Sequence, residues 1–259
     1  MDYGIILDGM NYSYSSVNTF DTCNLSFKMT YIDIEEKMGN AFGEYGSYMH
    51  SILEKFFRDK VDIWDLSKYY KKNYKRSIKC SFPSFPNGMS EKYFQQGIDF
   101  FNSFDFDKEK YEVVHIEEKI STQWKDFKFV FIADLVLKDK ETGEYILYDY
   151  KTANLFTKDR VDKKKLASIK KQVHLYAYFL WYTKQIEISK IRIWAIRNNK
   201  VIDMDYDNFY GLEALEWLET TVKKIKEEKD WEYDNSSPYF CQNTCSVRSV
   251  CPFMNGSGF

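Results

Sequence analysis

The spacing of hydrophobic positions divides the chain into a helical first part and a strand-rich middle. Between residues 41 and 58, apolar side chains recur every three or four positions, which is the spacing of an amphipathic helix. Similar patterns predict helices over 15–31 and 90–104. We therefore expect residues 1–110 to be mainly helical.

From about residue 111 the pattern changes to alternation and short apolar runs, which are typical of β-strands. The predicted strands are 111–117, 127–137, 144–151, 190–197 and 200–205, and the predicted later helices are 161–183 and 207–228. This order favours an α/β fold in one domain over 1–259. Its parts would be the helical part, a catalytic αβ core over 111–206, and a C-terminal helix and tail over 207–259.

Composition narrows the class of protein. The chain has 259 residues, and the 29% of them that are charged exclude a membrane-embedded chain. The net charge of −2 does not suggest a general nucleic-acid coat protein, and it does not exclude a nuclease. The acidic N-terminus lacks the pattern of a signal peptide, which predicts a cytoplasmic protein. A basic cluster fits a solvated helix face and a nucleic-acid contact equally well; its members are Lys163, Lys164, Lys165, Lys170 and Lys171.

Two carboxylates and one lysine are predicted to meet on neighbouring strands. Asp149 and Lys151 are two residues apart and share a strand face, and a hairpin would bring Asp134 beside them. Such a cluster suits Mg²⁺ or Mn²⁺, although an exposed ion pair would leave the same pattern. Gln172 and Tyr176 are four residues apart and share a face of the next helix, which an ordinary amphipathic helix also explains.

The order of these residues resembles the PD-(D/E)XK nuclease superfamily, in particular its RecB-like branch. The resemblance rests on Asp134, then Asp149-Tyr-Lys151-Thr, then Gln172-x-x-x-Tyr176. It implies a restriction-endonuclease-like core, in which helices flank a mixed central sheet, and a Mg²⁺- or Mn²⁺-dependent deoxyribonuclease activity.

The same resemblance implies roles for individual residues. The metal ligands would be His50, within Gly46-x-x-x-His50, Asp134, Asp149 and the backbone carbonyl of Tyr150. Lys151 would act on the attacking water and the phosphate, and Gln172 and Tyr176 would position the substrate or the site. The branch often carries a glutamate one strand earlier, where Glu117 and Glu118 both fit and we expect Glu118. His115, at the strand surface, and His174 are expected to be structural.

Four of the five cysteines form a second pattern. Cys241, Cys245 and Cys251 lie in the tail, and Cys23 lies far upstream. This pattern resembles the iron–sulfur nucleases, which include AddB-type nuclease domains, the CRISPR-associated exonuclease of the Cas-four type and phage exonucleases. The resemblance implies a 4Fe–4S cluster that joins the two chain ends. Three residues separate Cys241 from Cys245 where that group usually has two, and zinc or buried unligated cysteines remain alternatives. Cys80 lies outside the pattern.

The sequence contains no P-loop motif, so no helicase motor is expected within it. The resemblance implies an exonuclease on single-stranded DNA or DNA ends, in the cytoplasm of a bacterial, archaeal or phage-infected cell. It would act in recombination or repair, phage DNA processing or CRISPR adaptation, beside a separate helicase, recombination or CRISPR-adaptation protein. A catalytically silent, cluster-stabilised DNA-binding or assembly subunit and a structure-dependent endonuclease are the alternatives.

Overall fold

The computed structural model describes residues 3–231 and 237–255. Packing divides the chain into two compact units, each assembled from separate stretches. The terminal unit comprises Met1–Asn40, Ile120–Phe131 and Leu215–Phe259, and the central unit comprises Ala41–Lys119 and Ile132–Ala214. A single domain over 1–259 stays a prediction.

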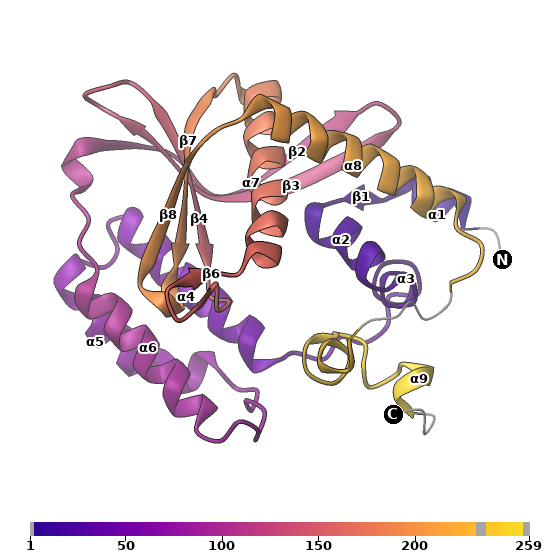
Figure 1. Ribbon diagram of the computed structural model, residues 1–259, viewed down its shortest axis with the longest axis horizontal. Helices are drawn as coiled ribbons and strands as arrows, with labels where there is room; N and C mark the ends of the chain where they lie inside the picture. The colour runs from indigo at the N-terminus through magenta and orange to yellow at the C-terminus, as the bar shows by residue number, and fades with distance from the viewer. Residues whose placement is uncertain (1–2, 232–236, 256–259) are drawn as a thin grey trace. The chain divides into compact units, whose positions relative to one another are not determined.

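Three helices form the first half of the central unit (Figure 1). They are α4 (Ala41–Phe57), α5 (Leu66–Ser77) and α6 (Met89–Ser103). The helices predicted over 41–58 and 90–104 are confirmed, whereas α5 was not predicted. Gly97 of α6 lies against the ring of Tyr70, where a Cβ atom would come within 2.3 Å of the tyrosine, so this glycine permits the close crossing of α5 and α6.

A mixed sheet forms the second half of the central unit. Strand β4 pairs antiparallel with β3 and parallel with β7, and β7 pairs antiparallel with β8. The parallel pair needs a crossover, which α7 supplies. The bounds are β3 Phe127–Asp139, β4 Tyr145–Lys151, α7 Lys163–Lys184, β7 Ile188–Ala195 and β8 Lys200–Asp205. The expected mixed sheet with flanking helices is therefore present.

The central unit also contains part of a long strand, a short hairpin and three 3₁₀ turns. Strand β2 (Tyr111–Trp124) pairs with β3 and runs on into the terminal unit. Strands β5 (Phe156–Thr157) and β6 (Arg160–Val161) form a two-stranded hairpin. Single 3₁₀ turns occupy Ile63–Asp65, Lys108–Lys110 and Ile196–Asn198.

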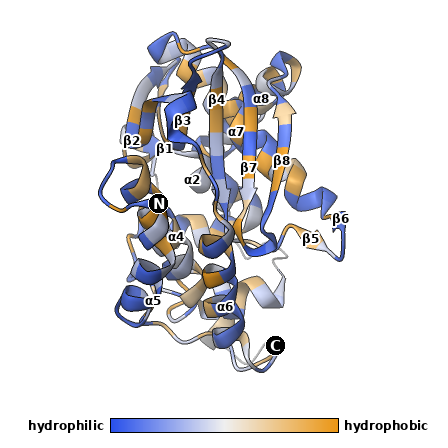
Figure 2. Cartoon of the chain, turned by 90° about the vertical axis from the view of Figure 1, so that its left-hand side faces the viewer, coloured by the Kyte–Doolittle hydropathy of each residue, from blue (hydrophilic) through white to orange (hydrophobic). Residues whose placement is uncertain are grey.

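Aromatic side chains fill the space between the sheet and α4, α5 and α6. Tyr148 and Tyr150 of β4 lie on this face with Trp194 of β7, and Tyr150 stacks on Trp194 at a centroid distance of 5.3 Å. Helix α7 packs on β4 and β7 in turn. Figure 2 shows hydrophobic and hydrophilic residues interleaved along the strands. Because β4 is a central strand, its five middle residues, Ile146–Tyr150, are buried, Asp149 among them.

The terminal unit contains short helices from both ends of the chain. The helix predicted over 15–31 is interrupted at Cys23, where the backbone is extended (φ −163°). Its elements are α1 Gly4–Gly9, β1 Asn11–Tyr12, α2 Tyr14–Thr22, α3 Asn24–Phe27, the π-helical turns Lys28–Ile32 and Phe240–Thr244, and α9 Pro252–Asn255. Strand β1 pairs parallel with β3, and α8 (Asn208–Glu227) enters this unit from Leu215 onward. No helix in the described ranges is long and apolar enough to cross a membrane.

Candidate metal centre

Helix α4 places His50 at the end of β4. The buried side of α4, which includes Tyr45, Met49 and Leu53, fixes its orientation against the core. One turn before His50, Gly46 faces Thr152, and a Cβ at that glycine would lie 3.1 Å from the threonine hydroxyl. The missing side chain therefore lets α4 approach the strand end closely, and His50 Nε2 lies 3.0 Å from the backbone carbonyl oxygen of Tyr150.

His50, Glu117 and Asp134 bring three ligand atoms within 4.8 Å of one another. His50 Nδ1 is 3.1 Å from Glu117 Oε1 and 3.6 Å from Asp134 Oδ1. This set of groups suits a divalent cation that prefers oxygen ligands and accepts one nitrogen. It offers one imidazole, two carboxylates and the nearby carbonyl of Tyr150. To bind it, His50 would exchange the hydrogen bond of one ring nitrogen for the metal.

The structure places Glu117 beside His50, whereas Glu118, the glutamate expected at the site, lies elsewhere. Glu117 has a left-handed backbone conformation (φ +46°), which interrupts the alternation of β2 and turns its carboxylate towards His50. The Glu118 side chain is 63% exposed and lies 3.6 Å from His115 Nδ1. His115, expected at the strand surface, is instead buried.

Asp149 and Lys151 lie on the same face of β4, as the period of two predicts. Lys151 Nζ is 2.7 Å from both carboxylate oxygens of Asp149 and donates a hydrogen bond to Oδ1. The second oxygen, Oδ2, is buried and accepts no well-aligned hydrogen bond within the described chain. Asp134 is held to the same strand because the Tyr150 N–H donates to its Oδ2 at 2.6 Å. A buried carboxylate oxygen that can still bind a further group is suited to a cation site.

The pKa values of the ionisable groups in this cluster are shifted by burial and by one another. Burial alone would lower the pKa of His50, but Asp134 and Glu117 outweigh it and raise this pKa to about 9. Burial raises the pKa of Asp149 to about 6, against the opposing effect of Lys151. Burial likewise raises the pKa of Asp134, while His50 and Lys151 oppose the shift. Burial is the largest cause of both raised carboxylate pKa values, and a divalent ion bound beside these groups would oppose it.

Comparison with known proteins agrees with this geometry. The model of the PD-(D/E)XK nuclease superfamily matches residues 11–252. The chain belongs to this superfamily. No curated protein matches it. Among solved structures, a presumed exonuclease from Eubacterium rectale is similar with a TM-score of 0.54 and 12% identity, over 95% of this chain and 88% of the other. At that identity the likeness shows a shared fold.

Two further predicted site residues of this PD-(D/E)XK chain lie on α7. Gln172 Nε2 donates a hydrogen bond to Tyr176 Oη at 3.1 Å, and Tyr176 is buried. They share a helix face as expected, and their role in the site stays a prediction. His174, between them in sequence, is buried, and its ring stacks on Tyr206 at 5.5 Å, in agreement with the structural role expected for it.

The terminal unit brings parts of the cysteine pattern together. Cys23, Cys241 and Cys245 are buried and Cys251 is half-buried. The Ser26 N–H donates to Cys23 Sγ at 3.4 Å, and Ser26 Oγ lies 3.6 Å from Cys245 Sγ. The two chain ends therefore meet at one serine.

Backbone hydrogen bonds join the same two ends. The Met38 N–H donates to the Ser246 carbonyl at 2.7 Å, and Arg248 donates to the Gly39 carbonyl at 3.0 Å. A single zinc ion would hold its four sulfurs about 3.8 Å apart, given Zn–S bonds of about 2.3 Å. Within the described chain, no three cysteine sulfurs lie as close as 4.8 Å to one another. Cys80 belongs to the central unit, where its thiol donates to Glu44 Oε1 at 3.4 Å.

Proposed function

We propose that the protein is a divalent-metal-dependent deoxyribonuclease that hydrolyses phosphodiester bonds in single strands or at DNA ends. The observation that carries the proposal is the convergence of His50, Glu117 and Asp134, whose ligand atoms lie within 4.8 Å of one another. Buried Asp149 and half-buried Lys151, which pair on one face of β4, would supply the remaining charged groups of a PD-(D/E)XK site.

The metal would be Mg²⁺ or Mn²⁺. His50, Glu117, Asp134 and the Tyr150 carbonyl would hold it, with the spare oxygen of Asp149 as a further ligand. When bound, the ion would polarise a phosphoryl oxygen and offset the charge that develops on it. Phosphodiester hydrolysis draws on that chemistry, which is why oxygen-rich ligands are appropriate here.

Lys151 would serve the reaction through its ammonium group. Asp149 fixes the position of Nζ by a 2.7 Å hydrogen bond, and the lysine side chain is still 20% exposed. A fixed ammonium at the edge of the site can orient the attacking water and stabilise negative charge on the phosphate. Gln172 and Tyr176 would position the substrate or the site.

An exonuclease is favoured over the alternatives. The fold is shared with the presumed exonuclease from Eubacterium rectale, and a silent subunit would have no need for a complete ligand group. The test is digestion of end-labelled linear and circular single-stranded DNA with Mn²⁺, with an Asp134→Ala variant as the background control. We expect the linear strand to be degraded and the circle to resist. Cutting of the circle would indicate an endonuclease, and hydrolysis of neither substrate with either ion would contradict the proposal.

We further propose that Cys23, Cys241, Cys245 and Cys251 hold a 4Fe–4S cluster. The support is the meeting of both chain ends at Ser26, which contacts the sulfurs of Cys23 and Cys245. The cluster would be structural, because its ligands belong to the terminal unit whereas the metal ligands belong to the central unit. The proposal also includes a biological role. The protein would act in recombination or repair, phage DNA processing or CRISPR adaptation, in a cytoplasm and beside a separate partner protein.

The cluster proposal has its own test. Protein purified without oxygen should be brown and contain about four irons per chain. Colourless protein with one zinc per chain would overturn the cluster and leave the nuclease proposal unaffected.

A further inference from the structure

One segment of the central unit is strongly basic in an otherwise slightly acidic chain. Residues 66–90 contain no Asp or Glu, while the whole chain has a net charge of −2. The cationic residues of the segment are Lys68, Lys71, Lys72, Lys75, Arg76 and Lys79. Lys71, Lys72 and Lys75 are exposed and form no ion pair within the described chain. Positive charge of this kind attracts a polyanion.

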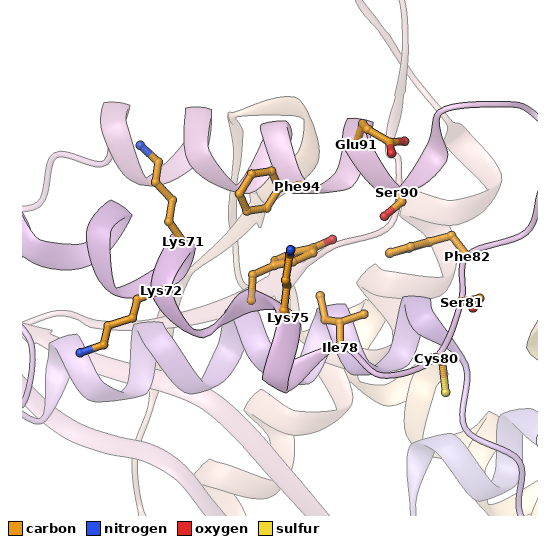
Figure 3. A pocket seen from close by; sticks show the side chains of 11 residues that line it. Lys71, Lys72, Lys75, Ile78, Cys80, Ser81, Phe82, Ser90, Glu91 and Phe94 are labelled. Carbon is orange, nitrogen blue, oxygen red and sulfur yellow. The ribbon is translucent and has the colours of Figure 1, made fainter.

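These three lysines line a groove between α5 and α6, which we call the α5–α6 groove. It has a volume of about 580 Å³; Tyr74, Phe82 and Phe94 also line it, together with one carboxylate, Glu91. Figure 3 shows Phe82 and Phe94 extending into the space from opposite sides, with Lys75 between them and the Cys80 sulfur turned away. Lysines beside aromatic rings are the combination with which proteins bind the phosphates and bases of single strands.

The groove is rigid because its walls are packed from behind. Phe94 packs against Tyr74 at a centroid distance of 4.8 Å, and Phe82 packs against Tyr93 at 4.6 Å. Tyr70 Oη donates to the Phe94 carbonyl at 3.2 Å and so ties the two helices together. A ligand would therefore meet a surface that needs little ordering, which favours binding.

The groove is also connected to the helix that carries His50. Glu44, in the first turn of α4, accepts hydrogen bonds from the Lys79 and Cys80 N–H groups, both at 2.7 Å, and these bonds lower the pKa of Glu44. Six residues separate Glu44 from His50, which is about 9 Å along a helix axis. A strand of a few nucleotides is long enough to cover that distance.

We propose that the α5–α6 groove binds the single-stranded DNA substrate at a distance of a few nucleotides from the metal centre. The inference rests on the proposed function. Lys71, Lys72 and Lys75 contact phosphates, and Phe82 and Phe94 stack on unpaired bases. A duplex keeps its bases stacked on one another and gives the rings nothing to bind, so the groove favours single strands.

The test separates binding from cleavage. Binding of a fluorescent 20-nucleotide oligo(dT) is measured by anisotropy in EDTA at several salt concentrations, with full-length protein. The test variant is Lys71→Ala/Lys72→Ala/Lys75→Ala. The matched control is Lys223→Ala/Lys224→Ala/Lys229→Ala, which removes the same charge from exposed positions of the terminal unit. A second variant, Phe94→Leu, removes a stacking surface while keeping an apolar side chain in the packing.

We expect the triple groove variant to bind about tenfold more weakly or worse, with a slope of log affinity against log salt reduced by about 2, and the control to bind normally. Phe94→Leu should weaken binding about fivefold or more. With Mn²⁺, the groove variant should show a raised KM and an unchanged kcat on the 20-mer. It should cleave a dinucleotide, which is too short to reach the groove, like the wild type.

Normal binding and cleavage of the 20-mer by the groove variant would overturn the inference while leaving the nuclease intact. Equal weakening by the control would also overturn it, because net charge alone would then explain the effect. A wild-type protein that cleaves no DNA would instead contradict the proposed function, and the binding data would still decide the groove.

Discussion

The metal-ligand group of the central unit and the cysteines of the terminal unit are held in place by different means. Asp134 is fixed by the Tyr150 N–H, and Tyr150 is itself 1% exposed within the aromatic core. Cys245, in contrast, lies in a cluster with Met29 and Val247 as its other buried members. The core packing of the central unit therefore holds Asp134 in place, whereas we expect the cysteine region to owe much of its stability to a bound metal.

The largest effect is expected from Asp149→Ala. This carboxylate is 4% exposed and orients Lys151, so its loss removes both a proposed metal ligand and the restraint on the lysine. We expect cleavage to fall by at least about a thousandfold, since both functions of the carboxylate are lost together. Asp159→Ala, at a side chain that is 96% exposed, is the matched control and should retain activity. An active Asp149→Ala enzyme would remove Asp149 from the site.

Lys151→Ala should lower kcat by about a hundredfold to a thousandfold, because it removes one charged donor from the reacting groups. The affinity for single-stranded DNA in EDTA should change little. Single-turnover cleavage beside equilibrium binding measures the two effects separately. Gln172→Ala and Tyr176→Phe should have smaller effects on kcat. A variant that binds weakly but cleaves bound DNA at the normal rate would show that Lys151 acts in binding.

Cysteine variants should lower thermal stability, whereas the catalytic variants should lower cleavage. Cys23→Ser or Cys241→Ser should lower the melting temperature by about 10 °C or more, since losing the metal costs several kcal/mol in a chain of this size. Cys80→Ser, in the central unit, is the control and should shift it little. A cluster-free variant with unchanged melting temperature but no cleavage would mean that the cluster acts on DNA and has no structural role.

A smaller effect is expected in the pH dependence of metal binding. His50 must lose its proton to bind a metal, and its pKa in the metal-free protein is raised to about 9. Mn²⁺ affinity should therefore fall about tenfold for each pH unit below 9. The effect on metal-free stability has the opposite sign: the stabilisation from charged His50 is complete below its unfolded pKa of about 6.5 and is lost as pH rises through 9. Calorimetric titrations at pH 7 and 8 measure the first effect, and equal affinities would show that no proton is displaced.

Much of the fold could be predicted because aliphatic and aromatic positions repeat with a clear period. Helix α5 escaped prediction because its core residues, Tyr70 and Tyr74, are tyrosines among lysines, although both are buried. The interruption of the helix at Cys23 could not be predicted from the sequence either, because no proline or glycine marks the extended backbone there.

The part of the site that depends on strand periodicity could be predicted from the sequence. Asp149 and Lys151 meet as their spacing requires. The choice between Glu117 and Glu118 could not be made from sequence, because two adjacent glutamates fit either face of a regular strand. The positive φ of Glu117, which a regular strand pattern does not predict, accompanies the contact between its carboxylate and His50.

This pair of glutamates provides the most direct test of the account. Mn²⁺ binding by calorimetry and cleavage of labelled single-stranded DNA should be compared for the wild type, Glu117→Gln and Glu118→Gln. The two variants remove the same charge from neighbouring positions, so each controls for the other. We predict that Glu117→Gln weakens both binding and cleavage by about a hundredfold or more, and that Glu118→Gln changes either by less than about threefold. Equal effects, or a larger effect of Glu118→Gln, would contradict the assignment of the metal centre to His50, Glu117 and Asp134.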